Sequence, residues 1–122
     1  MRLSDIKELM NGSLEVWELR VRNKELFESY KNSLNKMGKS IHVNVIEDQE
    51  LLIGKHELNV LCNFFIKDEI LTHELAFLAD VLGLSQNISF ESEDVEECIS
   101  HMTDPEVNGK FTKENAIEII TF

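Results

Sequence analysis

Histidine and cysteine are the residues of this chain best suited to catalysis or metal binding, but their spacing fits neither role. The four histidines are spread along the chain at His42, His56, His73 and His101. Two of them are followed by glutamate, yet neither has the second histidine four positions later that a zinc-binding helix needs. The two cysteines, Cys62 and Cys98, are too far apart for a Cys-x-x-Cys zinc site. We therefore predict no metal and no cofactor. The alternative is a site assembled from distant residues such as His56, Cys62 and His73.

Signals of nucleophilic catalysis are missing from the sequence as well. No Gly-x-Ser-x-Gly turn, phosphate-binding loop or Gly-x-Gly-x-x-Gly fingerprint occurs. Cys62 lies among apolar residues, which raise the pKa of a thiol and so leave it unreactive. The stretch DPEVNGKFTKE lacks the alternating oxygen ligands of a calcium loop. The sequence therefore predicts a protein that is not an enzyme.

Acidic residues are the most numerous candidate binding groups, and they are concentrated in the later part of the chain. With 23 acidic and 12 basic residues, the net charge is −11. Residues 1–40 carry a net charge of +2, whereas residues 41–122 carry −13. No lysine or arginine occurs between Lys67 and Lys110, an interval that holds eleven acids. Five of these acids fall within residues 91–97.

This acidic segment is the predicted partner-binding site. Its candidate residues are Glu91, Glu93, Asp94, Glu96, Glu97, Asp104 and Glu106. A negative field of this kind repels nucleic acid and raises the local concentration of cationic partners. Solubility alone needs a net charge of only about 2–8 in magnitude. The alternative is that the acids simply solvate the outer face of a helix.

Length and composition indicate the kind of fold that positions these residues. A chain of 122 residues, 43% of them hydrophobic, is long enough for one globular domain over residues 1–122 with its own core. No apolar run approaches the roughly 20 residues of a membrane span. The N-terminal residues lack the apolar core of a secretion signal. We expect a cytoplasmic protein that does not bind membranes.

Hydrophobic periodicity predicts a mainly α fold, a compact single-domain helical bundle with at most a short β-hairpin. In the C-terminal half, helices are expected near residues 56–67, 73–83, 92–102 and 112–120. A first helix near the N-terminus should end at Asn11-Gly12, because glycine favours the backbone conformation that closes a helix.

Two segments of the N-terminal half have a less regular pattern. Residues 13–37 predict one long helix or two abutting helices, although residues 14–22 also alternate like a strand. Residues 40–46 alternate between apolar and polar side chains and are the best candidate strand. Residues 50–53 would pair back on them, and this pairing forms the predicted hairpin.

The helix expected at residues 92–102 determines which acids face outward. Its apolar stripe is narrow and consists of Val95, Cys98, Ile99 and Met102. This stripe leaves four acids on the outer side, namely Glu93, Asp94, Glu96 and Glu97. Cys62 and Cys98 both occupy apolar helical positions, so they are expected to be buried and unpaired. A disulfide between them is the alternative.

Residues 70–120 resemble the carboxyl-terminal half of small bacterial immunity proteins, which are encoded beside polymorphic toxins such as those of contact-dependent growth inhibition. The resemblance lies in the EL-x-x-LAD-x-LGLS helix, the acidic-capped helix that follows, the DPEVNG turn and a final amphipathic helix. It implies a small cytoplasmic protein that binds one toxin domain tightly, in many cases a nuclease with a basic cleft. It assigns no individual contact residue.

The acidic segment and the resemblance together predict an immunity protein that neutralises a cognate toxin domain, of the nuclease class, by direct contact. Two alternatives stay open. One is an acidic mimic or adaptor that occupies a nucleic-acid-binding protein. The other is a small enzyme or ligand-binding domain with a dispersed site. If the acids only solvate their helix, the interface is expected around Trp17, Arg20 and Arg22 in the more basic N-terminal third.

Overall fold

The computed structural model describes residues 1–34, 43–103 and 110–121, and helices make up 66% of them. The helices are α1 (Leu3–Asn11), α2 (Val16–Arg22), α3 (Lys24–Leu34), α4 (Lys55–Ile66), α5 (Thr72–Leu84), α6 (Glu93–Met102) and α8 (Lys113–Thr121). The two strands are β1 (Leu51–Ile53) and β2 (Ile88–Phe90). The predicted mainly α fold is confirmed. Each of the four helices expected in the C-terminal half lies within one residue of its predicted bounds.

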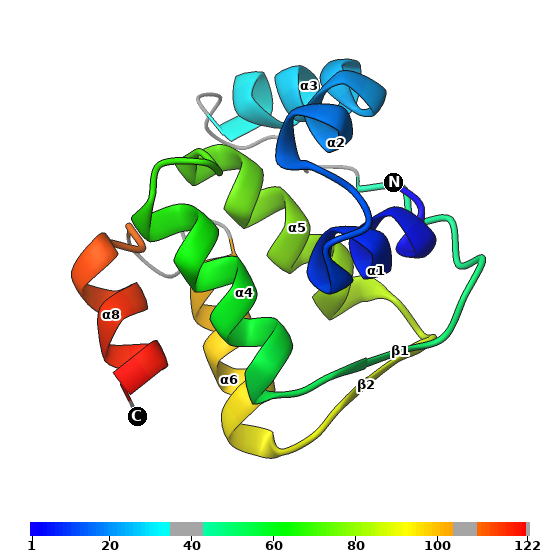
Figure 1. Ribbon diagram of the computed structural model, residues 1–122. Coiled ribbons are helices and arrows are strands. Elements are labelled where there is room, and N and C mark those ends of the chain that lie inside the picture. The colour runs from blue at the N-terminus through cyan, green and yellow to red at the C-terminus, as the bar shows by residue number, and fades with distance from the viewer. Residues whose placement is uncertain (35–42, 104–109, 122) are drawn as a thin grey trace.

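Helix α5 lies at the centre of the molecule, with α4 and α6 beside it and α3 across it (Figure 1). Its position follows from its sequence, which is apolar around almost the whole helix. The buried apolar residues of α5 are Leu75, Ala76, Phe77, Leu78, Ala79, Val81 and Leu82. The rings of Phe27 and Tyr30 on α3 meet the ring of Phe77 edge-on, at centroid distances of 5.2 and 5.3 Å. These contacts hold α3 on the core.

The segment from residue 13 to residue 34 forms two abutting helices, and the ambiguous residues 14–22 are helical from Val16 onward. The break falls at Asn23, which is buried and donates from Nδ2 to the carbonyl oxygen of Leu19 at 3.0 Å. Residues 35–37, where this helix was expected to end, lie outside the described residues. The first helix ends as predicted at Gly12, whose φ of +86° lies in the left-handed region that glycine adopts without strain.

The predicted hairpin is wrong. Strand β1 pairs in parallel with β2, in the register Leu51 to Ile88 and Ile53 to Phe90. In the described part of the segment expected as its partner, residues 43–46, pairing is limited to an isolated bridge between Ile46 and Arg2. The N-terminus fills the place of the missing strand, because the Met1 ammonium donates to the carbonyl oxygen of Asn44 at 2.7 Å. The alternation of apolar and polar residues correctly indicated that one side of residues 43–46 is covered. The segment that pairs with these residues is the N-terminus.

The parallel ribbon determines how the later helices are arranged. Since β1 leads into α4 and β2 leads into α6, the two helices leave the ribbon at the same end and run in the same direction (Figure 1). Helix α8 packs against α4. As a result, α4, α6 and α8 lie next to one another. No helix within the described ranges is long and apolar enough to cross a membrane.

Candidate functional site

Helix α6 carries the acidic residues that the sequence singles out. It begins after Ser92, whose hydroxyl accepts the backbone N–H of Val95 at 3.3 Å. Its buried residues are Val95, Ile99 and Met102. The four acids Glu93, Asp94, Glu96 and Glu97 are exposed. The narrow apolar stripe therefore leaves these carboxylates in solvent, as predicted.

These four carboxylates are not neutralised by the rest of the described chain. None of them forms an ion pair with a lysine or arginine in residues 1–34, 43–103 or 110–121. The one side chain within 4 Å of them that can carry a positive charge, among the described residues, is His101. Its Nε2 lies 3.6 Å from Oε1 of Glu97. The negative charges of these four side chains are therefore exposed to solvent.

Glu91 has a structural role that the sequence did not indicate. Its Oε2 accepts the backbone N–H of Lys55 at 2.9 Å, so it caps the start of α4 from the end of β2. Oε1 of Glu57 accepts the neighbouring N–H of Gly54 at 2.8 Å. Glu91 thus joins α4 to the loop before α6. The remaining predicted site residues, Asp104 and Glu106, lie outside the described residues.

A groove of about 500 Å³ opens between α6 and α8, with the first turn of α4 as its floor. From α6 it is lined by Asp94, Glu97, Cys98 and His101, together with the buried Val95. The first four stand at positions i, i+3, i+4 and i+7, which lie on one side of a helix. Glu93 and Glu96 do not line it. We call this cavity the α6–α8 groove.

The sequence predicts that the four α6 acids form one face, whereas the structure divides them into two pairs. Asp94 and Glu97 border the α6–α8 groove, whereas Glu93 and Glu96 are exposed and do not line it. The spacing of Asp94, Glu97, Cys98 and His101 was the signal that could have shown this. Without the position of α8, however, nothing in the sequence shows that this stripe borders a cavity.

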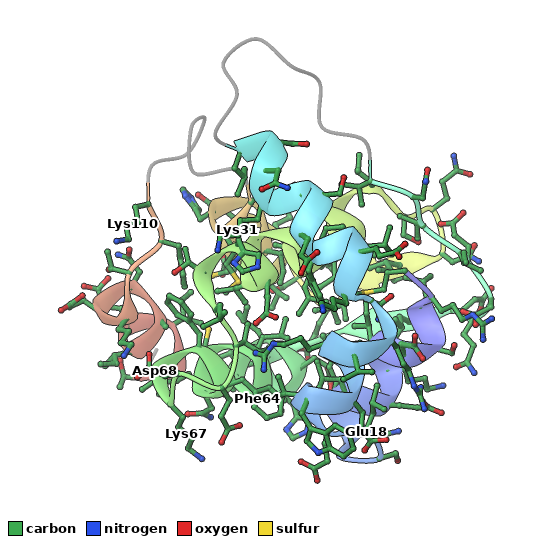
Figure 2. All side chains as sticks on the ribbon, turned by 90° about the horizontal axis from the view of Figure 1, so that it is seen from above. Glu18, Lys31, Phe64, Lys67, Asp68 and Lys110 are labelled. Carbon is green, nitrogen blue, oxygen red and sulfur yellow. The ribbon has the colours of Figure 1, made fainter. Side chains whose placement is uncertain are left out.

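The opposite wall of the groove is formed by α8 and the residues before it, and the floor is formed by α4. Their members are Lys55, Leu58, Lys110, Phe111, Asn115, Glu118 and Ile119. Lys55 Nζ donates to the carbonyl oxygen of Ile119, which ties α4 to α8. A second tie joins Lys113 Nζ to Asp68 Oδ1 at 2.6 Å. Figure 2 shows Asp68 at the end of α4 beside α8, and Lys110 at the outer edge of the molecule.

The two cysteines are free, as predicted, but they differ in burial. Cys62 is fully buried in α4, and this burial raises the pKa of its thiol to about 12. Cys98 is only half-buried because it sits where the apolar stripe of α6 meets the groove, so its predicted burial is wrong. Burial raises the pKa of Cys98, Lys55 lowers it, and Glu97 and Asp94 raise it further.

The alternative interface on α2 is largely occupied by internal contacts. Arg20 makes two hydrogen bonds to Glu74, at 2.6 and 2.8 Å, and Arg22 lies 3.1 Å from Asp5. Of the three residues expected there, Trp17 is the one without such a contact in the described chain, and 63% of its surface is exposed. Figure 2 shows Glu18 of the same helix well separated from Lys110, so α2 and the groove are distinct surfaces.

Among residues 1–34, 43–103 and 110–121, no three histidine, cysteine, aspartate or glutamate side chains are grouped closely enough to hold a metal ion. The site is therefore described by an exposed acidic helix beside a partly apolar groove. No protein-family model matches the chain, and comparisons with curated proteins and with solved structures likewise gave no match.

Proposed function

We propose that this chain is an immunity protein, which binds a cognate toxin domain in the cytoplasm and neutralises it by direct contact through α6. The observation that supports this best is the state of Glu93, Asp94, Glu96 and Glu97. All four are exposed, and none has a lysine or arginine partner in the described chain. Carboxylates left in this state are available to cations of another molecule.

The toxin that fits this surface is a basic one, such as a nuclease. A nuclease must present lysine and arginine to bind phosphates. An acidic helix that occupies such a cleft replaces the phosphate charge and excludes the substrate. Long-range attraction would speed the encounter, and close charge pairs would slow dissociation. The protein then needs neither a catalytic group nor a cofactor.

The test is co-expression with the toxin domain encoded beside this gene. Substitution of Glu93, Asp94, Glu96 and Glu97 by lysine should abolish protection and complex formation, with an unchanged circular dichroism spectrum. The association rate of the parent protein should fall as NaCl rises, since screening shortens the field to about 8 Å at physiological ionic strength.

A control variant on α3 has the same spacing and exposure as two of the α6 acids. Glu25 and Glu28 are exposed and three residues apart, as are Glu93 and Glu96. Glu25→Lys with Glu28→Lys should leave protection intact. Full protection by the four-fold α6 variant would show that these acids only solvate the helix.

The α6–α8 groove favours a second candidate, a small-ligand-binding or enzymatic domain. A partly apolar cavity of about 500 Å³ is within the size range of small-molecule sites, and the half-buried thiol of Cys98 lines it. This candidate predicts that the neighbouring gene product does not bind, and that a metabolite copurifies with the chain. A stable complex with the toxin domain would reject it.

A further inference from the structure

The carboxylates of the α6–α8 groove lie on two facing walls above an apolar floor. Asp94 and Glu97 belong to α6, and Glu118 belongs to α8. The side-chain carboxylates of Asp94 and Glu118 accept no hydrogen bond and form no ion pair within the described residues, and the carboxylate of Glu97 meets only His101. The apolar surface between the walls comes from Leu58, Val95 and Ile119.

The basic residues of the groove offset part of this charge, because three carboxylates and two lysines leave a formal net charge of −1 when His101 is neutral. Lys55 keeps its positive charge, but its ammonium donates to the carbonyl oxygen of Ile119 and is thereby held at the contact between α4 and α8. Lys110 is exposed and stands at the outer edge of the molecule (Figure 2). The whole chain carries a net charge of −11, which adds a further attraction for cations at the opening.

We infer, building on the proposed function, that the α6–α8 groove receives an arginine side chain of the toxin. The methylene stem of arginine would pack on the apolar floor, as such stems do wherever charged heads remain near water. Its guanidinium offers five donors in a planar fork and is more weakly hydrated than an ammonium. It can therefore bridge carboxylates from both walls, which a single ammonium does less well.

The groove is tested without any toxin by two probes of equal size and shape. N-butylguanidinium copies the end of an arginine side chain, and N-butylurea is its neutral counterpart. Titrated into the isotopically labelled full chain, butylguanidinium should shift the backbone amide resonances of residues 94–98 and 117–119 in a saturable way. Its affinity should exceed that of butylurea about fivefold, as expected for two partly exposed charge pairs.

Matched variants separate the groove acids from the outward acids of the same helix. Asp94→Asn with Glu97→Gln should reduce butylguanidinium binding to the level of butylurea. Glu93→Gln with Glu96→Gln removes the same charge from the same helix and should leave binding nearly unchanged. Equal loss in both variants, or no preference for butylguanidinium over butylurea, would overturn the inference.

Cys98 provides a second measurement of occupancy, because it lines the groove and Cys62 does not. In a Cys62→Ser background, bound butylguanidinium or toxin should slow alkylation of Cys98 by iodoacetamide several-fold. A toxin complex that forms and protects cells but leaves Cys98 equally reactive would reject the arginine site and preserve the proposed function. Selective butylguanidinium binding without any toxin complex would support a guanidinium site in the groove and reject the proposed function.

Discussion

Glu74 is the residue whose surroundings most clearly link burial to charge. Its side chain is only 5% exposed, and it accepts hydrogen bonds from Arg20 and from the backbone N–H of Leu71. Burial raises the pKa of Glu74, but these hydrogen bonds outweigh it, so the pKa lies below its ordinary value. The ionised carboxylate therefore holds α2 against the start of α5.

Glu74→Gln should lower the free energy of unfolding by about 2 kcal/mol at pH 7, because it removes a charge-assisted pair from a buried site. The folded-state pKa is lowered, so the contribution is complete above the ordinary carboxyl pKa and is lost as pH falls through the lowered value. Urea unfolding at pH 7 and at pH 3 measures both effects.

Glu25→Gln, at an exposed position on α3, is the control for the charge change and should alter stability little at either pH. A destabilisation by Glu74→Gln that stays equally large at pH 3 would contradict the assigned role of the carboxylate.

At the residue scale, the sequence predicted which acids are exposed but not what each one does. Exposure of Glu93 and Glu96 follows from helical periodicity, which is a local property. The cap that Glu91 provides for α4 depends on β1 and β2 being neighbours, and the groove beside Asp94 and Glu97 depends on α8. These are contacts between distant segments, so no local pattern encodes them.

At the element scale, the junction of β1 and α4 is held by carboxylates around Gly54. A Cβ atom added at Gly54 would lie 2.7 Å from Oε2 of Glu91 and 3.2 Å from Oε1 of Glu57. The backbone there has a φ of −111°, which alanine adopts readily. Alanine at this position would therefore displace the flexible capping carboxylates, although the backbone conformation itself would accept it.

Gly54→Ala should therefore destabilise the protein by about 1 kcal/mol, the usual value of a lost helix cap. Urea unfolding is the measurement. In a Glu91→Gln background the effect should be smaller, because part of the cap is already weakened.

Gly83→Ala gives the opposite sign and serves as the control. Gly83 lies in α5, where an added Cβ meets no atom within 4 Å. Alanine there should stabilise the protein by about 0.5–1 kcal/mol through helix propensity. Gly54→Ala that stabilised the protein in the same way would show that Glu91 does not cap α4.

The helices were predictable because apolar residues recur at helical spacing, as in α1 and α6, and because α5 is a long segment that is apolar on nearly every side. The ribbon was not, since β1 and β2 are three residues each and too short for a reliable alternation. The pairing of Leu51 with Ile88 spans two helices, and residues 50–53 carry no signal that distinguishes it from a hairpin.

At the scale of the whole molecule, the charge of −11 works against the compact state. The carboxylates of α6 repel one another and the other acids of the surface. By contrast, the pair of Arg20 and Glu74 is partly buried, with the carboxylate 5% exposed and the guanidinium side chain 40% exposed, so salt weakens it less than a fully exposed pair.

Raising NaCl from 10 to 150 mM should therefore increase the melting temperature by about 3 °C, corresponding to roughly 1 kcal/mol. Thermal unfolding followed by circular dichroism measures this. The variant Glu93→Gln with Glu96→Gln should show a smaller salt effect. A melting temperature that falls with salt would mean that attractive ion pairs dominate the electrostatics of the fold.

The parallel ribbon also sets the order in which the molecule can assemble. Pairing Leu51 with Ile88 encloses all of α4 and α5, and such long closures are slow to form. We expect the α4–α5 hairpin to fold first, the ribbon to close next and bring α6 beside α4, and α8 to dock afterwards. The walls of the α6–α8 groove would then be formed by the contacts that are made last during folding. A surface of this kind can open and reshape around a partner while the α5 core stays folded.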